Sequence, residues 1–264
     1  MEITRRQYTV DLKFDVDGAI GTIALNRPGK RNALSLELLQ QLSSLLTSIS
    51  QNNDIRVVIM KGEGKVFSAG HDISQLVGRE LTYYKAIFDT CIEVMEKIQR
   101  LPQPVIAQVH GVATAAGCQL VAACDLAVAE EGTLFGTPGV KIGLFCSTPG
   151  VPLVRAIGRK RALEMLLTGR MILAEEAEQY GLINKVVPPD QLAAETRALA
   201  EKIAEASSLI LSMGKEAFYT QVNLADFQAY DYAKQVIVTN LFAEDAREGL
   251  SAFLEKRKPI WKGK

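Results

Sequence analysis

Residues 105–125 constrain the fold more than any other part of the chain. An apolar run, Val105–Val109, is followed by a turn rich in glycine and alanine and then by a short apolar segment that begins near Ala115 and has a helical pattern. Neither the run nor the helix has a polar face to turn toward water. The sequence therefore predicts a buried strand–turn–helix unit.

The turn of this unit also has a chemical interpretation. A helix that begins near Ala115 has unpaired backbone N–H groups in its first turn, at the positive end of its dipole. The small side chains of Ala113, Ala115, Ala116 and Gly117 allow another molecule to approach the backbone closely. These features would suit a site for a polarised oxygen, whereas simple packing of small residues is the alternative.

Strand and helix patterns alternate through most of the chain. Strands are expected at 8–14, 20–25, 57–60, 105–109, 126–129, 134–135 and 185–187, with a hairpin turn at Asp17-Gly18. Helices are expected after a Ser35 cap, from near Ala115, and at 82–101, 149–167 and 174–180. From Asp190 onward only helical patterns occur. We therefore predict an α/β body over residues 1–197 and a helical region over residues 198–264.

Composition excludes several classes of function. The chain has 264 residues, of which 48% are hydrophobic, and this is enough for a well-buried core. Lys+Arg and Asp+Glu both number 30, so no net field favours nucleic acid or an anionic membrane surface. No apolar stretch is long enough for a membrane span or a signal peptide. The cysteines lack metal-type spacing and are expected to be reduced thiols, so we expect a cytoplasmic protein, or one of the mitochondrial matrix if a transit peptide has been removed.

Four motifs in order resemble one family. They are Asn26-Arg27-Pro28 with Asn32-Ala33-Leu34, Phe67-Ser68-Ala69-Gly70-His71-Asp72, His110-Gly111 with Ala116-Gly117-Cys118, and Gly181-Leu182-Ile183 with Val186-Val187. Together they resemble the enoyl-CoA hydratase/isomerase (crotonase) superfamily over nearly the whole chain. Residues 140–150, VKIGLFCSTPG, most resemble the subgroup named for enoyl-CoA hydratase domain-containing protein three.

The resemblance implies a fold, a ligand and an assembly. The expected fold is a crotonase-type spiral of ββα turns with a C-terminal helical oligomerisation region, which forms a homotrimer or a dimer of trimers. The expected ligand is an acyl-CoA whose thioester carbonyl accepts hydrogen bonds from the backbone N–H groups of His71 and Ala116. No metal or other cofactor is implied, because coenzyme A enters as part of the substrate.

Other positions follow from the same resemblance. The family's pantetheine and phosphate contacts correspond to Lys30, Arg31 and Ala33, although a solvated face is the alternative for these cations. The wall around the carbonyl and adenine corresponds to Ser68, Ala69, Gly70, Asp72 and Ile73, and Asp72 is also a candidate N-cap. Residues that a neighbouring subunit brings to the nucleotide correspond to Phe253 and Lys256.

The family's two catalytic glutamates are absent. Their positions hold Gln119, three residues after the second donor, and Gly139, after Phe135-Gly136-Thr137-Pro138. An amide orients water but does not take its proton at neutral pH, and glycine has no side chain. Standard two-glutamate hydration is therefore not expected, although replacement of both residues by glutamate is expected to introduce some of it.

Several activities remain open. His71 is a candidate base with an ordinary pKa near neutrality, and a ring that only follows the loop is the alternative. Cys146 is a candidate for the acyl pocket wall, Cys118 is expected to pack inside a helix, and His110 is expected to bond backbone. The sequence therefore favours an acyl-CoA enzyme of the hydratase/isomerase class that uses another base. A thioester hydrolase, a decarboxylase and an acyl-CoA-binding protein without turnover are the alternatives.

Overall fold

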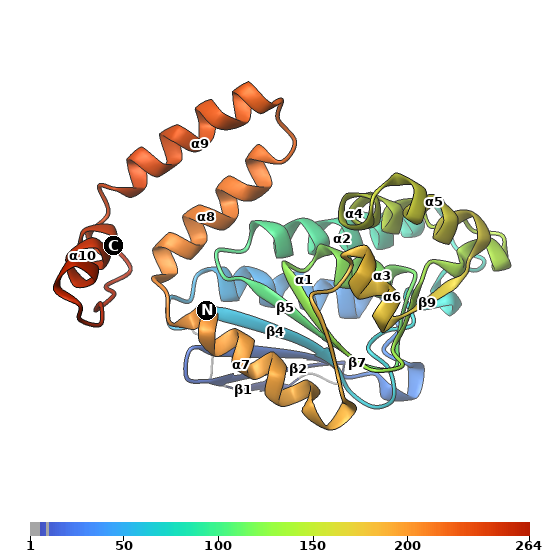
Figure 1. Cartoon of the computed structure of the whole chain (residues 1–264). Coiled ribbons are helices and arrows are strands. Elements are labelled where there is room, and N and C mark those ends of the chain that lie inside the picture. Colours follow the sequence, from blue (N-terminus) through green and yellow to red (C-terminus); the bar gives the residue numbers. More distant parts are fainter. Residues whose placement is uncertain (1–5, 9–10) are drawn as a thin grey trace.

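A seven-stranded sheet forms the centre of the computed structural model, which describes residues 6–8 and 11–264 (Figure 1). Its spatial order is β1-β2-β3-β4-β5-β7-β10, with the first three strands antiparallel and the rest parallel. The strands are β1 (Arg6–Tyr8), β2 (Leu12–Asp17), β3 (Ile20–Leu25), β4 (Val57–Gly62), β5 (Val105–Val109), β7 (Leu126–Glu130) and β10 (Lys185–Val187). The hairpin at Asp17-Gly18 is confirmed, and residues 9 and 10 of the expected first strand lie outside the described residues.

Both faces of this sheet are covered. Alternate strand residues such as Val58 and Met60 face a large core, whereas Val57 and Ile59 face a smaller one that includes Leu192 and Ala200 of α7 (Leu192–Ala204). The large core holds α1 (Leu36–Ser50) and α2 (Leu81–Arg100). A parallel sheet buried on both faces accounts for the nearly continuous apolar strands of the sequence.

The first two helices begin and end near the expected residues. Ser35 is the N-cap of α1, and its hydroxyl accepts a hydrogen bond from the Leu38 N–H at 3.3 Å. The apolar face of α2 buries Ile87, Cys91 and Met95, but Ile92 is exposed.

A second, three-stranded sheet was only partly expected. It consists of β6 (Val112–Thr114), β8 (Leu134–Gly136) and β9 (Met171–Leu173), in the order β6-β8-β9. Residues 134–135 of β8 were expected from the sequence, whereas β6 and β9 were not. The segment after β5 that was expected to be a turn contains the strand β6, which leads directly into α3 (Ala116–Ala123).

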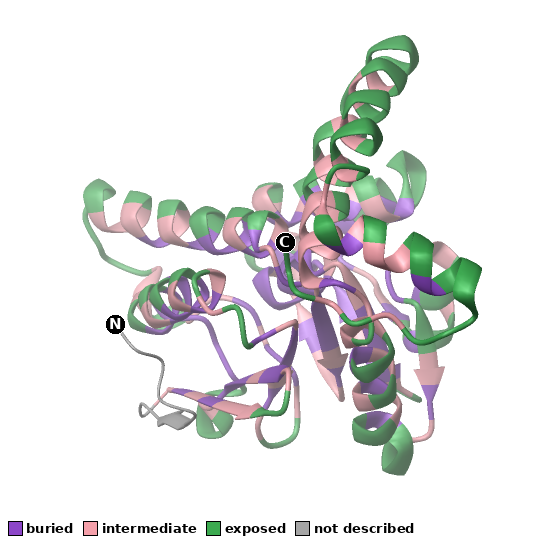
Figure 2. Ribbon diagram, turned by 90° about the vertical axis from the view of Figure 1, so that its left-hand side faces the viewer, coloured by how far each residue is buried: buried purple, intermediate pink, exposed green. Residues whose placement is uncertain are grey.

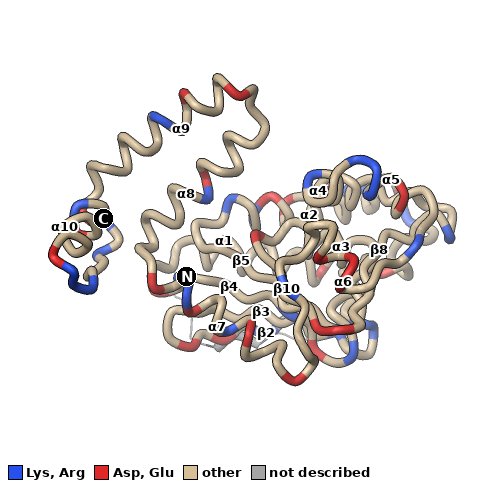
Figure 3. Tube along the Cα trace, in the orientation of Figure 1, with Lys and Arg blue, Asp and Glu red and all other residues tan. Residues whose placement is uncertain are grey.

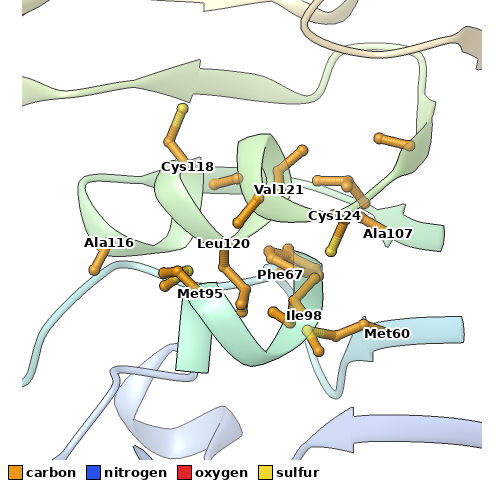
Figure 4. Packing of buried hydrophobic residues seen from close by; sticks show 14 of the residues in the cluster. Met60, Phe67, Met95, Ile98, Ala107, Ala116, Cys118, Leu120, Val121 and Cys124 are labelled. Carbon is orange, nitrogen blue, oxygen red and sulfur yellow. The ribbon is translucent and has the colours of Figure 1, made fainter. Parts of the chain in front are cut away.

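The α3 helix lies inside the large core. All of its residues except Ala122 are buried. Leu120 points toward Phe67 and Met95, and Cys118 points the opposite way (Figure 4). The expected buried strand–turn–helix unit is thus confirmed.

The expected helix at 149–167 is wrong in one respect. It is two helices, α4 (Ser147–Ile157) and α5 (Arg159–Thr168), separated by Gly158 at φ +79°. Glycine adopts this left-handed conformation without the penalty of a Cβ, so the chain turns there. The next helix, α6 (Ala174–Tyr180), has the expected bounds and ends at Gly181.

The last three helices project from the body (Figures 1 and 2). They are α8 (Ser208–Gln221), α9 (Asp226–Asn240) and α10 (Glu244–Glu255). No residue of α8 or α9 is buried, and the exposed ones include Phe218, Phe227 and Tyr230. The proposed boundary at residue 197 stays a prediction. Residue 197 lies within α7, which packs on the sheet.

A buried ion pair fastens α8 to the body. The Lys215 ammonium donates to Asp125 Oδ2 at 2.6 Å and to the carbonyl oxygens of Ile98 and Gln103 at 2.8 and 3.0 Å. Tyr219 donates to the other oxygen of Asp125 at 2.8 Å. Burial raises the pKa of the Asp125 carboxyl and lowers that of the Lys215 ammonium. The opposite charge of each group counteracts the effect of burial on its partner. Every ammonium proton thus has an acceptor.

Charged residues of both signs are interspersed along the chain (Figure 3). Figure 3 also shows that α9 carries charge at only a few positions. Within residues 6–8 and 11–264, no helix has the length and apolar character that a membrane crossing requires.

Candidate functional site

A cavity of about 410 Å³ lies where three loops meet beside α2 and α3. The loops contribute residues between Ala69 and Leu76, between Thr114 and Ala116, and between Pro138 and Pro149, and α2 contributes Phe88. The wall is largely apolar. Its side chains that form hydrogen bonds or ionise are those of His71, Thr114, Lys141, Cys146, Ser147 and Thr148. Among the described residues, no Asp or Glu lines this cavity.

The first notable group is the backbone N–H of His71. Leu34 pairs with His71 as an isolated parallel bridge, in which the Leu34 N–H donates to Gly70 O and the Asp72 N–H donates to Leu34 O. In such a bridge, the N–H of the middle residue points to the opposite side. The His71 amide donates no hydrogen bond to any residue in the described part of the chain.

The second is the backbone N–H of Ala116, the first residue of α3. It lies beyond the reach of any helical acceptor, and it too has no partner among residues 11–264. The preceding Ala115 has φ +50° and ψ −119°, a conformation that costs a residue with a Cβ about 1–3 kcal/mol. This strained turn allows the chain to pass directly from β6 into α3.

Two glycines bring the loops of these amides into contact. A Cβ on Gly70 would lie 2.9 Å from the Thr114 carbonyl oxygen and 3.2 Å from the Ala116 nitrogen. A Cβ on Gly117 would lie 2.4 Å from the carbonyl oxygen of Ser68. The close approach therefore requires glycine at both positions, and both His71 and Ala116 line the cavity.

The His71 ring lies against Phe88, with ring centroids 5.1 Å apart and an edge-to-face angle of 74°. Both ring nitrogens are buried, and neither has a hydrogen-bond partner among the described residues. Burial lowers the pKa of the imidazole below its ordinary value, because the charged form loses its hydration, and the Leu34 backbone opposes this shift. Burial therefore favours the uncharged form of the ring.

Gln119 is 3% exposed, and its Oε1 atom has no partner within the described residues. It lies three residues after Ala116, so both share one face of α3. It is not itself a lining residue of the cavity. A buried, unpaired amide of this kind costs about 1–3 kcal/mol and indicates an unfilled contact.

Gly139 lines the cavity but has no space for a side chain. A Cβ there would lie 2.5 Å from the Leu144 carbonyl oxygen and 2.7 Å from Cys146 Sγ. The Cys146 thiol, the N-cap residue of α4, thus fills the volume into which a side chain at 139 would project. Burial raises the pKa of this thiol, while a hydrogen bond with the Gly139 backbone opposes the shift.

Hydrogen bonds of Arg27 and Asn32 connect the loop 26–34 to the segments 63–66 and 67–73. We call these bonds the polar framework, and the sequence motifs did not predict them. Arg27 donates to Asp72 Oδ2 at 3.0 Å and to the Ala33 carbonyl oxygen at 2.6 Å. The buried Asn32 amide donates to the carbonyl oxygens of Glu63 and Val66, each at 2.8 Å. A buried pairing of this type is decided by distant partners rather than by local pattern.

Two residues predicted for the cavity wall belong to this framework. The Ser68 side chain is fully buried and donates to the Asn32 carbonyl oxygen at 2.8 Å, so it does not face a ligand. Asp72 caps the short helix Ile73–Gln75 and accepts from the Ser74 N–H at 3.2 Å. Hydrogen bonds from Ser74 and Arg27 lower the pKa of the Asp72 carboxyl. The N-cap interpretation of Asp72 is confirmed.

The other predicted residues divide into two groups. Those that line the cavity are Ala69, His71, Ile73, Ala116, Gly139 and Cys146. Those that do not are Lys30, Arg31, Ala33, Ser68, Gly70, Asp72, Gln119, Phe253 and Lys256. Lys30 and Arg31 are exposed on the loop before Asn32, and Phe253 and Lys256 are exposed at the end of α10. Their ligand contacts stay predictions.

The remaining cysteines and the second histidine have structural surroundings. Burial raises the pKa of Cys91 and Cys118 to about 12 and that of Cys124 further still. The ring of His110 lies with Nε2 3.0 Å from the Gly64 carbonyl oxygen, as expected for a backbone contact. Within the described residues, no cluster of three His, Cys, Asp or Glu side chains is arranged to hold a metal ion.

Comparisons with known proteins agree with this arrangement. Residues 15–264 match the model of the enoyl-CoA hydratase/isomerase family. Enoyl-CoA hydratase domain-containing protein 3, mitochondrial, from Mus musculus is 50% identical over 245 residues, which span 92% of this chain and 81% of the relative. The human protein of that name has a crystal structure with TM-score 0.93 and 48% identity, covering 95% of this chain and 100% of its own. An enoyl-CoA hydratase structure from Mycobacterium smegmatis has TM-score 0.93 and 45% identity, covering 95% and 98%.

Proposed function

Because the chain belongs to the enoyl-CoA hydratase/isomerase family, which acts on acyl-CoA substrates, we propose that its cavity binds the thioester end of an acyl-CoA. The thioester carbonyl oxygen accepts hydrogen bonds from the N–H groups of His71 and Ala116. The observation that supports this proposal is that both amides are unpaired and that both residues line the same largely apolar cavity. Unpaired backbone donors in such a place need an acceptor, and a ligand carbonyl supplies one.

This arrangement favours chemistry that places negative charge on the thioester oxygen. Removal of a group from the α-carbon, or addition to the carbonyl or the β-carbon, moves an electron pair onto that oxygen. Fixed donors in a largely apolar wall stabilise the charge without reorganising, and one such donor contributes about 3–4 kcal/mol in enzymes where it has been removed. The strain at Ala115 fits this role, since strained backbone is often retained at reacting sites.

Two-glutamate hydration is not part of the proposal. Gln119 holds the first position with a neutral amide, and Gly139 holds the second without room for a side chain. The proposed activity is therefore that of a family enzyme, formally of the lyase or isomerase class, whose proton transfers use other groups. A thioester hydrolase and a decarboxylase remain within the same scheme, because both pass through charge on the thioester oxygen.

A second candidate is an acyl-CoA-binding protein without turnover. The lack of a carboxylate among the described lining residues favours it, because a clamp for the carbonyl needs no base. In this case the two amides contribute affinity only. Turnover assays with crotonyl-CoA, trans-3-enoyl-CoA, malonyl-CoA and saturated acyl-CoAs separate the two candidates, and binding without reaction in all of them selects the second.

The remainder of the coenzyme is proposed to lie outside the cavity. Lys30 and Arg31 are exposed cations on the loop that Asn32 fixes in place, so they can meet phosphate groups in solvent. Phe253 and Lys256 are exposed on α10, at the end of the chain that projects from the body. We propose that they contact the nucleotide part of the coenzyme A that is bound to a neighbouring subunit. The exposed apolar residues of α8 and α9 favour self-association, as a trimer or a dimer of trimers.

The location of the protein also belongs to the proposals. Several relatives carry the word mitochondrial in their names, and this favours the matrix over the cytoplasm.

The proposal predicts a specific dependence on the ligand carbonyl. Butyryl-CoA is expected to bind more tightly than S-butyl-CoA, a thioether that has the same chain but no carbonyl oxygen. Two hydrogen bonds contribute about 1–3 kcal/mol in total, which corresponds to about 5- to 150-fold in Kd. Titration calorimetry measures both constants on the unmodified protein. Equal affinity for the two ligands would contradict the proposed role of the His71 and Ala116 amides.

A further inference from the structure

The Cys146 thiol takes the place of the missing side chain at position 139. Its Sγ atom lies 2.7 Å from where a Cβ on Gly139 would be, and both residues line the cavity. The residue is half-buried, whereas the other three cysteines are buried. Cys146 is thus the thiol that a molecule inside the cavity meets.

A second observation is that polar groups without protein partners belong to the same cavity. The backbone N–H groups of His71 and Ala116 have no partner in the described chain, and both residues line the cavity together with Cys146. A bound thioester supplies the acceptor that these N–H groups lack, and its acyl chain then lies in the largely apolar cavity that Cys146 lines.

The other reactive side chains of the wall are less suited to attack a bound acyl chain. Lys141 and Ser147 are exposed, and the His71 ring has both nitrogens buried against protein. Thiols are also intrinsically stronger nucleophiles than hydroxyls. The position and the chemistry therefore both select Cys146.

We propose that Cys146 is a covalent capture site for α,β-unsaturated acyl thioesters. The Sγ–H bond breaks and an Sγ–Cβ bond forms at the β-carbon of the bound enoyl group. The electron pair of the C=C bond moves onto the thioester oxygen, which the His71 and Ala116 amides hold. It then returns to the α-carbon, which takes the proton that the thiol released. The product is a thioether that retains the whole coenzyme A, with no oxidant or other reactant required.

This inference rests on the proposed function, because the amides hold the thioester during the addition. Burial raises the pKa of the Cys146 thiol, so little thiolate is present at pH 7 and the capture is slow. Positioning of the electrophile next to Sγ, rather than an activated thiol, is what makes Cys146 selective. The other three cysteines serve as controls within the same molecule.

Intact-mass spectrometry after incubation with crotonyl-CoA tests the proposal. The protein is expected to gain the mass of one crotonyl-CoA, and peptide mapping is expected to place it on Cys146. Butyryl-CoA has no C=C bond and is expected to add no mass, and an excess of it is expected to protect Cys146. Cys146→Ser is expected to lose the adduct, whereas Cys91→Ser is expected to retain it.

Two outcomes overturn the proposal, and neither depends on a variant. An unmodified wild-type protein that still binds butyryl-CoA in calorimetry would contradict capture while leaving the proposed function intact. An adduct spread over several cysteines, or one that excess butyryl-CoA does not prevent, would show reaction outside the cavity. Failure to bind either acyl-CoA would instead overturn the proposed function itself.

Discussion

Two parts of the site differ in the groups that they offer a ligand: one offers backbone amides and the other offers side chains. At the donor end, formed by His71 and Ala116, the functional groups are backbone amides fixed by Gly70, Gly117 and the strained Ala115. The acid end is our name for Gly139 and Cys146 of the cavity wall together with the buried Gln119; it would depend on side chains, and the family's two glutamates are absent from it. Backbone groups depend on the fold, whereas side-chain groups change with one substitution. The donor end can therefore be retained while the reaction at the acid end changes.

The largest expected effect is at the donor end. Gly117→Ala is expected to lower the free energy of unfolding by about 3 kcal/mol, because the new Cβ would lie 2.4 Å from the Ser68 carbonyl oxygen. Either α3 or the Ser68 loop must move, so acyl-CoA affinity should fall as well. Chemical denaturation and calorimetry measure the two losses.

Gly214→Ala is the matched control for this substitution. Gly214 also lies inside a helix, α8, but has nothing within 4 Å of its would-be Cβ. Here alanine is expected to add about 0.5–1 kcal/mol of stability through helix propensity alone. If the two variants change stability alike, the close contact of α3 with the Ser68 loop does not determine the donor end.

The next effect tests the acid end. The sequence alone suggests that Gln119→Glu with Gly139→Glu introduces hydration, but the structure changes that expectation. A side chain at 139 meets the Leu144 carbonyl oxygen at 2.5 Å and Cys146 Sγ at 2.7 Å. The Gly139→Glu substitution is therefore expected to cost about 2 kcal/mol of stability. The double variant is expected to give no hydration of crotonyl-CoA, which is measured by the loss of enoyl absorbance.

The single variant Gln119→Glu is the comparison for this test. It preserves the shape of the side chain, so the fold should be retained, although burial should keep the new carboxyl largely protonated. Hydration by the double variant at a rate above that of Gln119→Glu alone would show that the loop after Pro138 yields, and that the acid end is open to redesign.

The smallest expected effect is a pH dependence at the donor end. Burial lowers the pKa of the His71 imidazole in the folded protein, whereas the unfolded chain has the ordinary value of about 6.5. The unfolded state thus binds more protons, and stability is lost as the pH falls from about 6.5 through the lower folded pKa. His71→Gln is expected to reduce the slope of the denaturation midpoint between pH 7.5 and pH 5. An identical slope in the variant would mean that the His71 ring is hydrated.

The sequence predicted the donor end better than the acid end for a physical reason. Apolar periodicity and capping residues act locally, so β5, α6 and β10 have the bounds that were expected. Small residues around Ala116 were a local signal for close approach, and the structure places Ala116 beside the cavity. Its role as a donor is still a prediction from the family and from the unpaired N–H.

The rest depends on contacts between distant residues. No local pattern states that Cys146 fills the space beside Gly139, seven residues away, or that Arg27 pairs with Asp72 across 45 positions. The same limit applies to Ser68, whose motif suggests a ligand contact but whose hydroxyl is bonded to Asn32. Short strands such as β6 and β9 form because their neighbours are already in place, rather than through their own propensity.

The ion pair in the middle of α8 has a mechanical consequence. Six residues, about 9 Å of helix, separate Lys215 from Gln221 at the end of α8, so a tilt of about 5° at Lys215 would displace that end by about 0.8 Å. Helix α9 continues from that end, and its apolar side chains would move with it. The hydrogen bonds of Lys215, which use all three of its ammonium protons, therefore fix the point about which α8 can tilt. In the assembly proposed above, this ion pair would set how precisely α8 and α9 meet a second subunit.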